Sequence, residues 1–163
     1  MKMIGWLLGF LGASFAAAAL GGFATSRSVA TWYRTLRKPC WNPPDWVFGP
    51  VWTALYVAMG VSAWLVRVGM GQERRQTGMG VAALAVWAVQ LVLNVLWSVV
   101  FFGRRSVGGG LAVIVPLWAA IGATALLSAR VAKRAGALLL PYFAWTSFAT
   151  ALNYKVWQLN RGR

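Results

Sequence analysis

The stretch VAALAVWAVQLVLNVLWSVVFF, residues 81–102, decides the fold. It carries no charged side chain, and it lies in an uncharged segment, 76–103, that exceeds the roughly 20 apolar residues a helix needs to cross the hydrocarbon core of a bilayer. Four more uncharged segments are long enough to do the same: 3–26, 46–66, 106–129 and 135–154. The sequence therefore predicts five membrane-spanning helices.

Composition also places the chain in lipid. It is 60% hydrophobic with a mean hydropathy of +0.63, outside the range of a soluble domain of 163 residues. Backbone groups in lipid must be hydrogen-bonded internally, and the short alternating strands of a β-barrel are not seen. We expect an all-α integral membrane bundle, formed as a single domain by residues 1–163, whose first segment is retained and not removed as a secretion signal.

Charge points to a membrane surface as the partner. The net charge is +14, from 16 Lys and Arg against only Asp45 and Glu73. The cations fall at segment ends and in loops, where anionic headgroups would meet them, so no nucleic acid partner is expected. Cations are slightly more numerous on the side of the first loop and the C-terminus, which favours a cytoplasmic location for that side.

Residues for ordinary catalysis are scarce. The chain has no histidine and a single cysteine, Cys40, so the usual nitrogen and sulfur metal sites and an internal disulfide are not expected. General acid and base chemistry draws mainly on His, Asp, Glu and Cys, and the two acids lie in different loops. A conventional hydrolase, a metal site and a required cofactor are not expected.

Small residues recur at every fourth position of the first segment, at Gly5, Gly9, Ala13, Ala17 and Gly21. This spacing lets two helices approach closely in lipid. It fits a seam between two copies in a homodimer and tight packing inside one bundle equally well.

The first connection, about 25–46, is the one long polar segment between helices. It contains Trp32, Tyr33 and Trp41 together with three prolines. Proline restricts φ and keeps the preceding residue extended, so this segment should form a stiff cap over one mouth of the bundle. A belt of aromatic residues at the membrane interface is the alternative interpretation.

Three segments present aromatic or amide side chains on one helical face. Amides are costly in lipid, so their face should point into the bundle, as hydrogen-bonding groups between helices or as ligand contacts. Converging aromatic faces suit a planar, largely apolar ligand, although packing alone also explains them. The residues on these faces are Trp52 and Tyr56, then Gln90, Asn94, Trp97 and Phe101, and finally Tyr142, Trp145, Ala149 and Leu152.

Taken together, these residues resemble the TspO family, the tryptophan-rich sensory proteins of bacteria and the mitochondrial translocator protein, also called the peripheral benzodiazepine receptor. The resemblance spans nearly the whole chain, in several dispersed motifs in the right order. The residues that carry it are Trp32, Tyr33, Leu36, Lys38, Pro39, Trp41, Pro43, Pro44, Trp46, Phe48, Pro50, Val51, Trp52, Thr53, Leu55, Tyr56, Gln90, Leu91, Asn94, Trp97, Phe101, Phe102, Pro141, Tyr142, Trp145, Phe148, Ala149, Leu152, Asn153, Tyr154 and Trp157.

The resemblance implies a five-helix bundle, commonly a homodimer, whose pocket under the first loop binds porphyrins and other tetrapyrroles, sterols and benzodiazepine-type ligands. A bacterial member would lie in the cell envelope. The pocket residues that it implies are Trp32, Tyr33, Trp52, Asn94, Trp97, Trp145, Ala149 and Leu152.

The resemblance favours a tetrapyrrole-binding sensor, regulator or transporter. One alternative is light-dependent porphyrin breakdown, and another is sterol or lipid binding and transport. A sterol-like ligand is disfavoured at the C-terminus, because the family's pattern of Leu or Val, Tyr and a spaced cation is incomplete: Lys155 directly follows Tyr154, and Arg161 is too far away.

A porphyrin would add two expectations. Its edge carboxylates should pair with cations at the mouth of the pocket, from Arg34, Arg37 or Lys38. Its metal should add little affinity, because no histidine exists to coordinate an axial position. Metal-free protoporphyrin should then bind about as well as haem.

Overall fold

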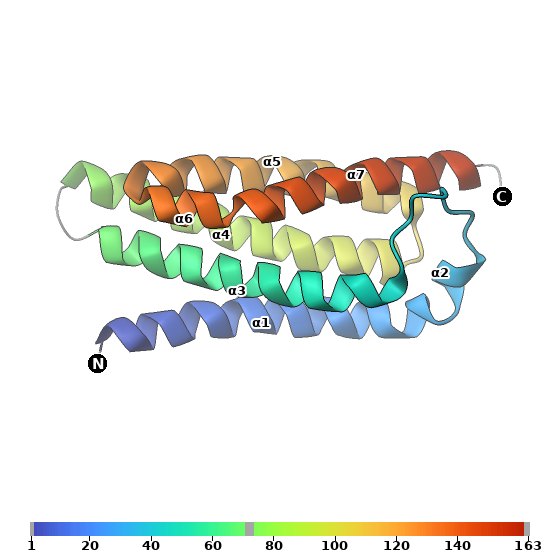
Figure 1. The fold of residues 1–163 in the computed structure, drawn as a ribbon, viewed down its shortest axis with the longest axis horizontal. Helices are drawn as coiled ribbons and strands as arrows, with labels where there is room; N and C mark the ends of the chain where they lie inside the picture. The colour runs from blue at the N-terminus through green and yellow to red at the C-terminus, as the bar shows by residue number, and fades with distance from the viewer. Residues whose placement is uncertain (1, 71–73, 162–163) are drawn as a thin grey trace.

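In the part of the chain that the structure describes, five long helices lie side by side and are long and apolar enough to cross a membrane (Figure 1). The computed structural model describes residues 2–70 and 74–161. The long helices are α1 (Lys2–Val29), α3 (Asp45–Gly69), α4 (Arg74–Ser98), α5 (Val107–Val131) and α7 (Leu140–Asn160). The short elements are α2 (Trp32–Thr35), the π-helical turn η1 (Val99–Gly103) and α6 (Lys133–Leu138). The prediction of an all-α bundle with five membrane-spanning helices is confirmed.

Most helices extend beyond the predicted segments. α1 continues past residue 26 to Val29, and α7 continues past residue 154 to Asn160. A charged side chain ends an uncharged segment but does not end a helix, because the last turns leave the hydrocarbon core and are solvated at the interface. The first connection is therefore 30–44, shorter than the expected 25–46, and it contains the unexpected helix α2.

The fifth predicted span is interrupted. α6 ends at Leu138 and α7 begins at Leu140, with Leu139 between them in a turn. Pro141 lies in the first turn of α7, where a backbone N–H has no acceptor within the helix, so the N–H that proline lacks is not needed there. The uncharged segment 135–154, which predicts a single helix, is thus divided between two helices, and the second begins next to the proline.

The termini lie at opposite ends of the bundle, as an odd number of crossings requires (Figure 1). The end that holds the C-terminus also holds α2 and the turn between η1 and α5. We call it the α2 end.

Helix packing follows the small residues. α1 packs on α3 and α4, α4 packs on α5, and α5 packs on α7. A Cβ on Gly60 would lie 2.7 Å from Cδ2 of Leu11, so α3 and α1 approach too closely there for a larger residue. The small residues of α1 have different surroundings. Gly21 packs against Ser98 of α4, whereas a Cβ added to Gly5 or Gly9 would have no described atom of another element within 4 Å.

A π turn ends the α4 span. The Arg104 N–H donates to the Val99 carbonyl at 2.8 Å, five residues back, and not to the residue four back as in an α-helix. The wider turn brings two consecutive side chains to Trp97: its ring lies 5.3 Å from Phe101 and 5.7 Å from Phe102, between centroids. Such turns are frequent at functional sites.

Candidate functional site

A cavity of about 430 Å³ lies inside the α2 end of the bundle. Its volume falls in the range of small-molecule sites, roughly 300–1,000 Å³. Residues from α1, α2, α3, α4, η1 and α7 line it, and we call it the aromatic cavity. Its aromatic lining residues are Phe15, Tyr33, Phe48, Trp52, Tyr56, Trp97, Phe102 and Trp145.

Most of the residues predicted from the sequence lie on this cavity. Trp32 and Leu152 do not. Trp32 packs edge-on against Phe101, with ring centroids 5.7 Å apart, and Leu152 is buried with 7% of its surface exposed. That the remaining residues bind a ligand stays a prediction; they are Tyr33, Trp52, Asn94, Trp97, Trp145 and Ala149.

Neighbouring rings hold the indoles of the cavity in place. The Trp52 ring lies 5.7 Å from that of Tyr56 and 6.1 Å from that of Tyr142, between centroids. The Trp145 ring meets Phe48 nearly edge-on at 5.8 Å. Tilted and edge-to-face contacts of this kind are the favourable ones for aromatic pairs. The walls are therefore preformed and need little rearrangement to receive a flat molecule.

A chain of hydrogen bonds forms the floor of the cavity and joins α3, α4 and α7. The Tyr56 hydroxyl donates to Oδ1 of Asn94 at 2.7 Å, and Nδ2 of Asn94 donates to the Tyr142 hydroxyl at 2.9 Å. The Tyr142 hydroxyl in turn donates to Oε1 of Gln90 at 3.1 Å. Both amides thus connect helices, and of the two only Asn94 also lines the cavity.

The polar atom of Trp97 is also satisfied within the protein. Its indole N–H donates to Oδ1 of Asn153 at 3.2 Å, and Nδ2 of Asn153 donates to the Val107 carbonyl at 2.9 Å. The indole therefore has no free donor for a ligand and offers its apolar surface. Aromatic contact, and not hydrogen bonding, is the main interaction available on this wall.

The 30–44 connection is held against the α2 end at separate points. Asn160 of α7 pairs with the Arg37 backbone twice: its Nδ2 donates to the Arg37 carbonyl at 3.0 Å, and its Oδ1 accepts from the Arg37 N–H at 3.1 Å. The Trp41 ring meets the Phe148 ring at 5.7 Å. Next to the connection, the Ser28 hydroxyl donates to the Phe102 carbonyl at 2.7 Å.

None of the three cations expected at the mouth, Arg34, Arg37 and Lys38, lies on the lining of the cavity. The Lys38 ammonium lies 3.9 Å from the centre of the Tyr33 ring, and both arginines are exposed. The charged residue on the lining is Asp45, an acid at the start of α3. Burial, reinforced by the negative charge of Asp45, raises the pKa of Tyr33 to about 12, so its phenol keeps its proton at physiological pH.

Several lining residues were not predicted. Phe102 reaches the cavity through the π turn, which no sequence period signals. Phe15 and Gly22 of α1 and Thr53 of α3 are exposed residues that also line the cavity. Because both helices are long and apolar enough to cross a membrane, exposed lining residues on them indicate an opening of the cavity toward lipid.

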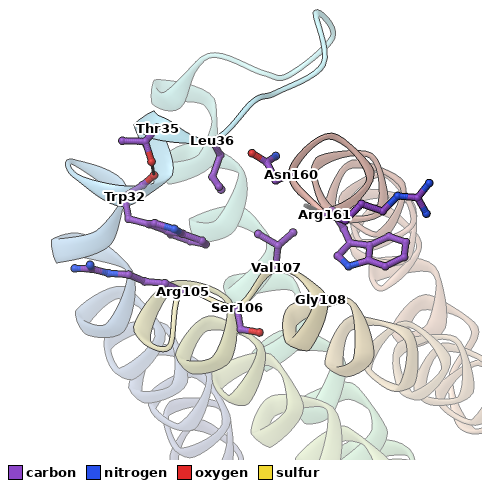
Figure 2. A pocket seen from close by; sticks show the side chains of 10 residues that line it. Trp32, Thr35, Leu36, Arg105, Ser106, Val107, Gly108, Asn160 and Arg161 are labelled. Atoms are coloured by element: carbon purple, nitrogen blue, oxygen red, sulfur yellow. Dashed lines mark hydrogen bonds between the residues drawn. The ribbon is translucent and has the colours of Figure 1, made fainter. Parts of the chain in front are cut away.

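A second hollow, of about 440 Å³, lies outside the bundle at the same end (Figure 2). Trp32, Asn160 and the start of α5 line it. Arg105 and Arg161 lie on opposite sides, and Figure 2 shows their side chains directed outward, away from its centre. Trp32 thus lines this second hollow and packs on Phe101 of η1, and it is not on the lining of the aromatic cavity.

Comparison with known proteins gives one consistent answer. The model of the TspO/MBR family matches residues 10–158. A tryptophan-rich protein TspO of Chlorobaculum tepidum is 44% identical over 92% of this chain and 92% of its own. The human translocator protein is 42% identical over 90% and 87%, and a tryptophan-rich sensory protein of Cereibacter sphaeroides is 39% identical over 90% and 89%.

Proposed function

The chain belongs to the TspO/MBR family, and from this premise we propose that it is a membrane sensor, regulator or transporter that binds a planar tetrapyrrole in the aromatic cavity. The sensor or transporter role rests on membership and on relatives named as sensory and translocator proteins. That the ligand is a tetrapyrrole is a more specific proposal than the sensor or transporter role. A bacterial cell envelope is the proposed location, since two of these relatives come from bacteria.

The observation that carries the tetrapyrrole proposal is the convergence of Trp52, Trp97 and Trp145 on one preformed cavity. Indole rings offer large flat contact areas, and the polar atoms nearby are largely engaged within the protein. A flat, largely apolar macrocycle suits these walls. A sterol has no π system that could stack on the indole rings, so sterol-like ligands are the second choice.

Titration with metal-free protoporphyrin and with haem tests the proposal. We expect both pigments to quench tryptophan emission with similar affinity, because the chain has no histidine to ligate iron. Trp52→Ala and Trp145→Ala should each weaken binding roughly tenfold by removing a stacking surface. Haem binding far tighter than protoporphyrin, with a thiolate-type or phenolate-type spectrum, would contradict this account.

Trp118→Phe is the matched control for these titrations. Trp118 is an exposed indole on α5 that stacks on Phe143 and does not line the cavity. Its loss should lower total emission and leave both dissociation constants unchanged. If the three variants bind alike, the ligand does not occupy the aromatic cavity.

Light-dependent breakdown of the bound pigment is the alternative that the same three indoles would favour, since an excited macrocycle would lie against them. Illumination of the complex, followed by absorbance and product analysis, separates it from binding alone. A pigment that bleaches equally fast with wild type and with Trp52→Ala, both fully loaded, excludes a role for this indole in breakdown.

A further inference from the structure

Asp45 is an acid on the cavity lining of a strongly basic chain. The chain carries a net charge of +14, yet the charged residue on the described lining of the aromatic cavity is this acid. Asp45 is the first residue of α3, at the mouth of the cavity, and its side chain is exposed. The cations expected at this mouth are absent from the lining.

The carboxylate of Asp45 is unpaired among the described residues: none of their lysines or arginines forms an ion pair with it. The nearby Tyr33 hydroxyl donates elsewhere, to Oδ1 of Asn42 at 3.1 Å. Asp45 still acts electrically on the lining, because its charge is one of the causes that raise the pKa of Tyr33. A carboxylate without an ion-pair partner among the described residues therefore lines this part of the cavity. The Lys38 ammonium lies against the Tyr33 ring and not on the lining.

We infer that Asp45 sets the charge preference of the aromatic cavity. It favours a planar ligand that presents a neutral hydrogen-bond donor or an ammonium group to the mouth, and it disfavours one that places a carboxylate there. The inference rests on the proposed function and narrows its ligand class: a macrocycle with edge carboxylates must direct them away from Asp45 or bind less tightly.

The physical reason is that an ionised carboxylate only accepts hydrogen bonds. A donor or an ammonium group on the ligand gains a charge-assisted bond, whereas a second carboxylate gains repulsion and loses hydration. Asp45 is exposed, so solvent and salt screen part of this effect. The surrounding apolar walls keep the screening below that of open water.

A purely structural role for Asp45 is the competing explanation. An acid in the first turn of a helix stabilises the positive end of the helix dipole. That role would change the stability of α3 but would not depend on the charge of a ligand. Charge selectivity across a ligand series is therefore the decisive measurement.

The experiment uses three metal-free porphyrins with one macrocycle: protoporphyrin, its neutral dimethyl ester, and a derivative whose two carboxylates are replaced by amines. Each is titrated against protein in nanodiscs of uncharged lipid at low salt. Relative to wild type, we expect Asp45→Asn to tighten the dicarboxylate and weaken the diamine, each by roughly three- to tenfold, and to leave the ester unchanged. Asp45→Glu should keep the wild-type preference.

Thr35→Lys is the matched control for net charge. It raises the net charge by one, as Asp45→Asn does by removing a negative charge, at the same end of the bundle but from a residue outside the aromatic cavity. Its effects on the three affinities should be less than half of those of Asp45→Asn. Equal effects of the two variants, or a shift of all three ligands by the same factor in Asp45→Asn, would overturn the inference.

A smaller pair of probes separates this inference from the proposed function. Naphthylmethylamine and naphthoate are planar, small enough for a cavity of about 430 Å³, and opposite in charge. If porphyrins do not bind but wild type prefers the amine and Asp45→Asn loses that preference, the tetrapyrrole proposal fails and the role of Asp45 stands. If porphyrins bind and no ligand pair responds to Asp45, the inference fails and the proposal stands.

Discussion

The amides Gln90 and Asn94 show how single polar residues work inside this bundle. Each is 1% exposed, and each accepts a hydrogen bond from a tyrosine hydroxyl. Unpaired amides at membrane depth are costly, so these pairings remove a penalty as well as adding a bond between helices. The sequence left both interhelical and ligand-binding roles open, and the structure places Gln90 in the first alone.

Tyr142→Phe tests the energy of this chain. The substitution removes the hydroxyl that links Asn94 and Gln90, so we expect the free energy of unfolding to fall by about 1–2 kcal/mol. Denaturant titration in mixed micelles measures it. Tyr154→Phe is the control, because that side chain is 47% exposed, and its unfolding free energy should change by less than about 0.5 kcal/mol. Equal losses in both variants would contradict the network's role.

The place of Trp52, Trp97 and Trp145 could be predicted from the sequence because a regular helix repeats its faces with a fixed period. The place of Phe102 could not, because the π turn that re-aims this residue depends on hydrogen bonding, which no period encodes. Nor does a sequence period indicate that Asp45 lies on the lining and that Arg34, Arg37 and Lys38 do not. The place of these cations depends on how the 30–44 connection lies on the bundle, and Asn160, 123 residues beyond Arg37, holds that connection. That the cations pair with a ligand's carboxylates stays a prediction.

At the scale of elements, α1 differs from the other spans. Only 11% of its most apolar stretch is buried inside the bundle, against 33–39% for the other four spans, so most of its surface faces outward. Its close contacts occur at two glycines: Leu11 packs against Gly60 of α3, and Gly21 packs against Ser98 of α4. At Gly5 and Gly9, by contrast, an added Cβ would have no described atom of another element within 4 Å.

Gly60→Val and Gly9→Leu should therefore act differently. A side chain at Gly60 meets Leu11 at 2.7 Å and forces α1 away from α3, which should cost about 1–3 kcal/mol of unfolding free energy. Gly9→Leu should leave that energy unchanged. If two copies associate through this face of α1, Gly9→Leu should shift the mass measured by light scattering toward the monomer. A destabilised Gly9→Leu monomer would show that the face packs within the bundle.

At the scale of the whole molecule, the connection that covers the α2 end depends on a contact between distant parts of the chain. The two hydrogen bonds of Asn160 to the Arg37 backbone join the middle of the connection to the last turn of α7. Each such bond contributes about 1 kcal/mol. The position of the cover is thus a property of the complete bundle.

Asn160→Ala should loosen this cover without unfolding the helices. We expect exchange of the amide hydrogens in residues 36–42 to rise roughly thirtyfold, since losing two bonds of about 1 kcal/mol each raises the open population by that order. Exchange in α5 should not change. Gln158→Ala, on the same helix end but bonded to Lys155, is the control and should match wild type. Unchanged exchange in Asn160→Ala would show that other contacts hold the connection.

The lipid-facing side of the aromatic cavity, where Phe15, Gly22 and Thr53 are exposed, has a thermodynamic consequence. An apolar ligand that dissolves in the bilayer meets this opening at its concentration in lipid, which partitioning raises far above its concentration in water. A modest intrinsic affinity then suffices for occupancy in a cell. An apparent dissociation constant expressed per volume of water should rise in proportion to the lipid added, whereas one expressed as a mole fraction of the membrane should stay constant.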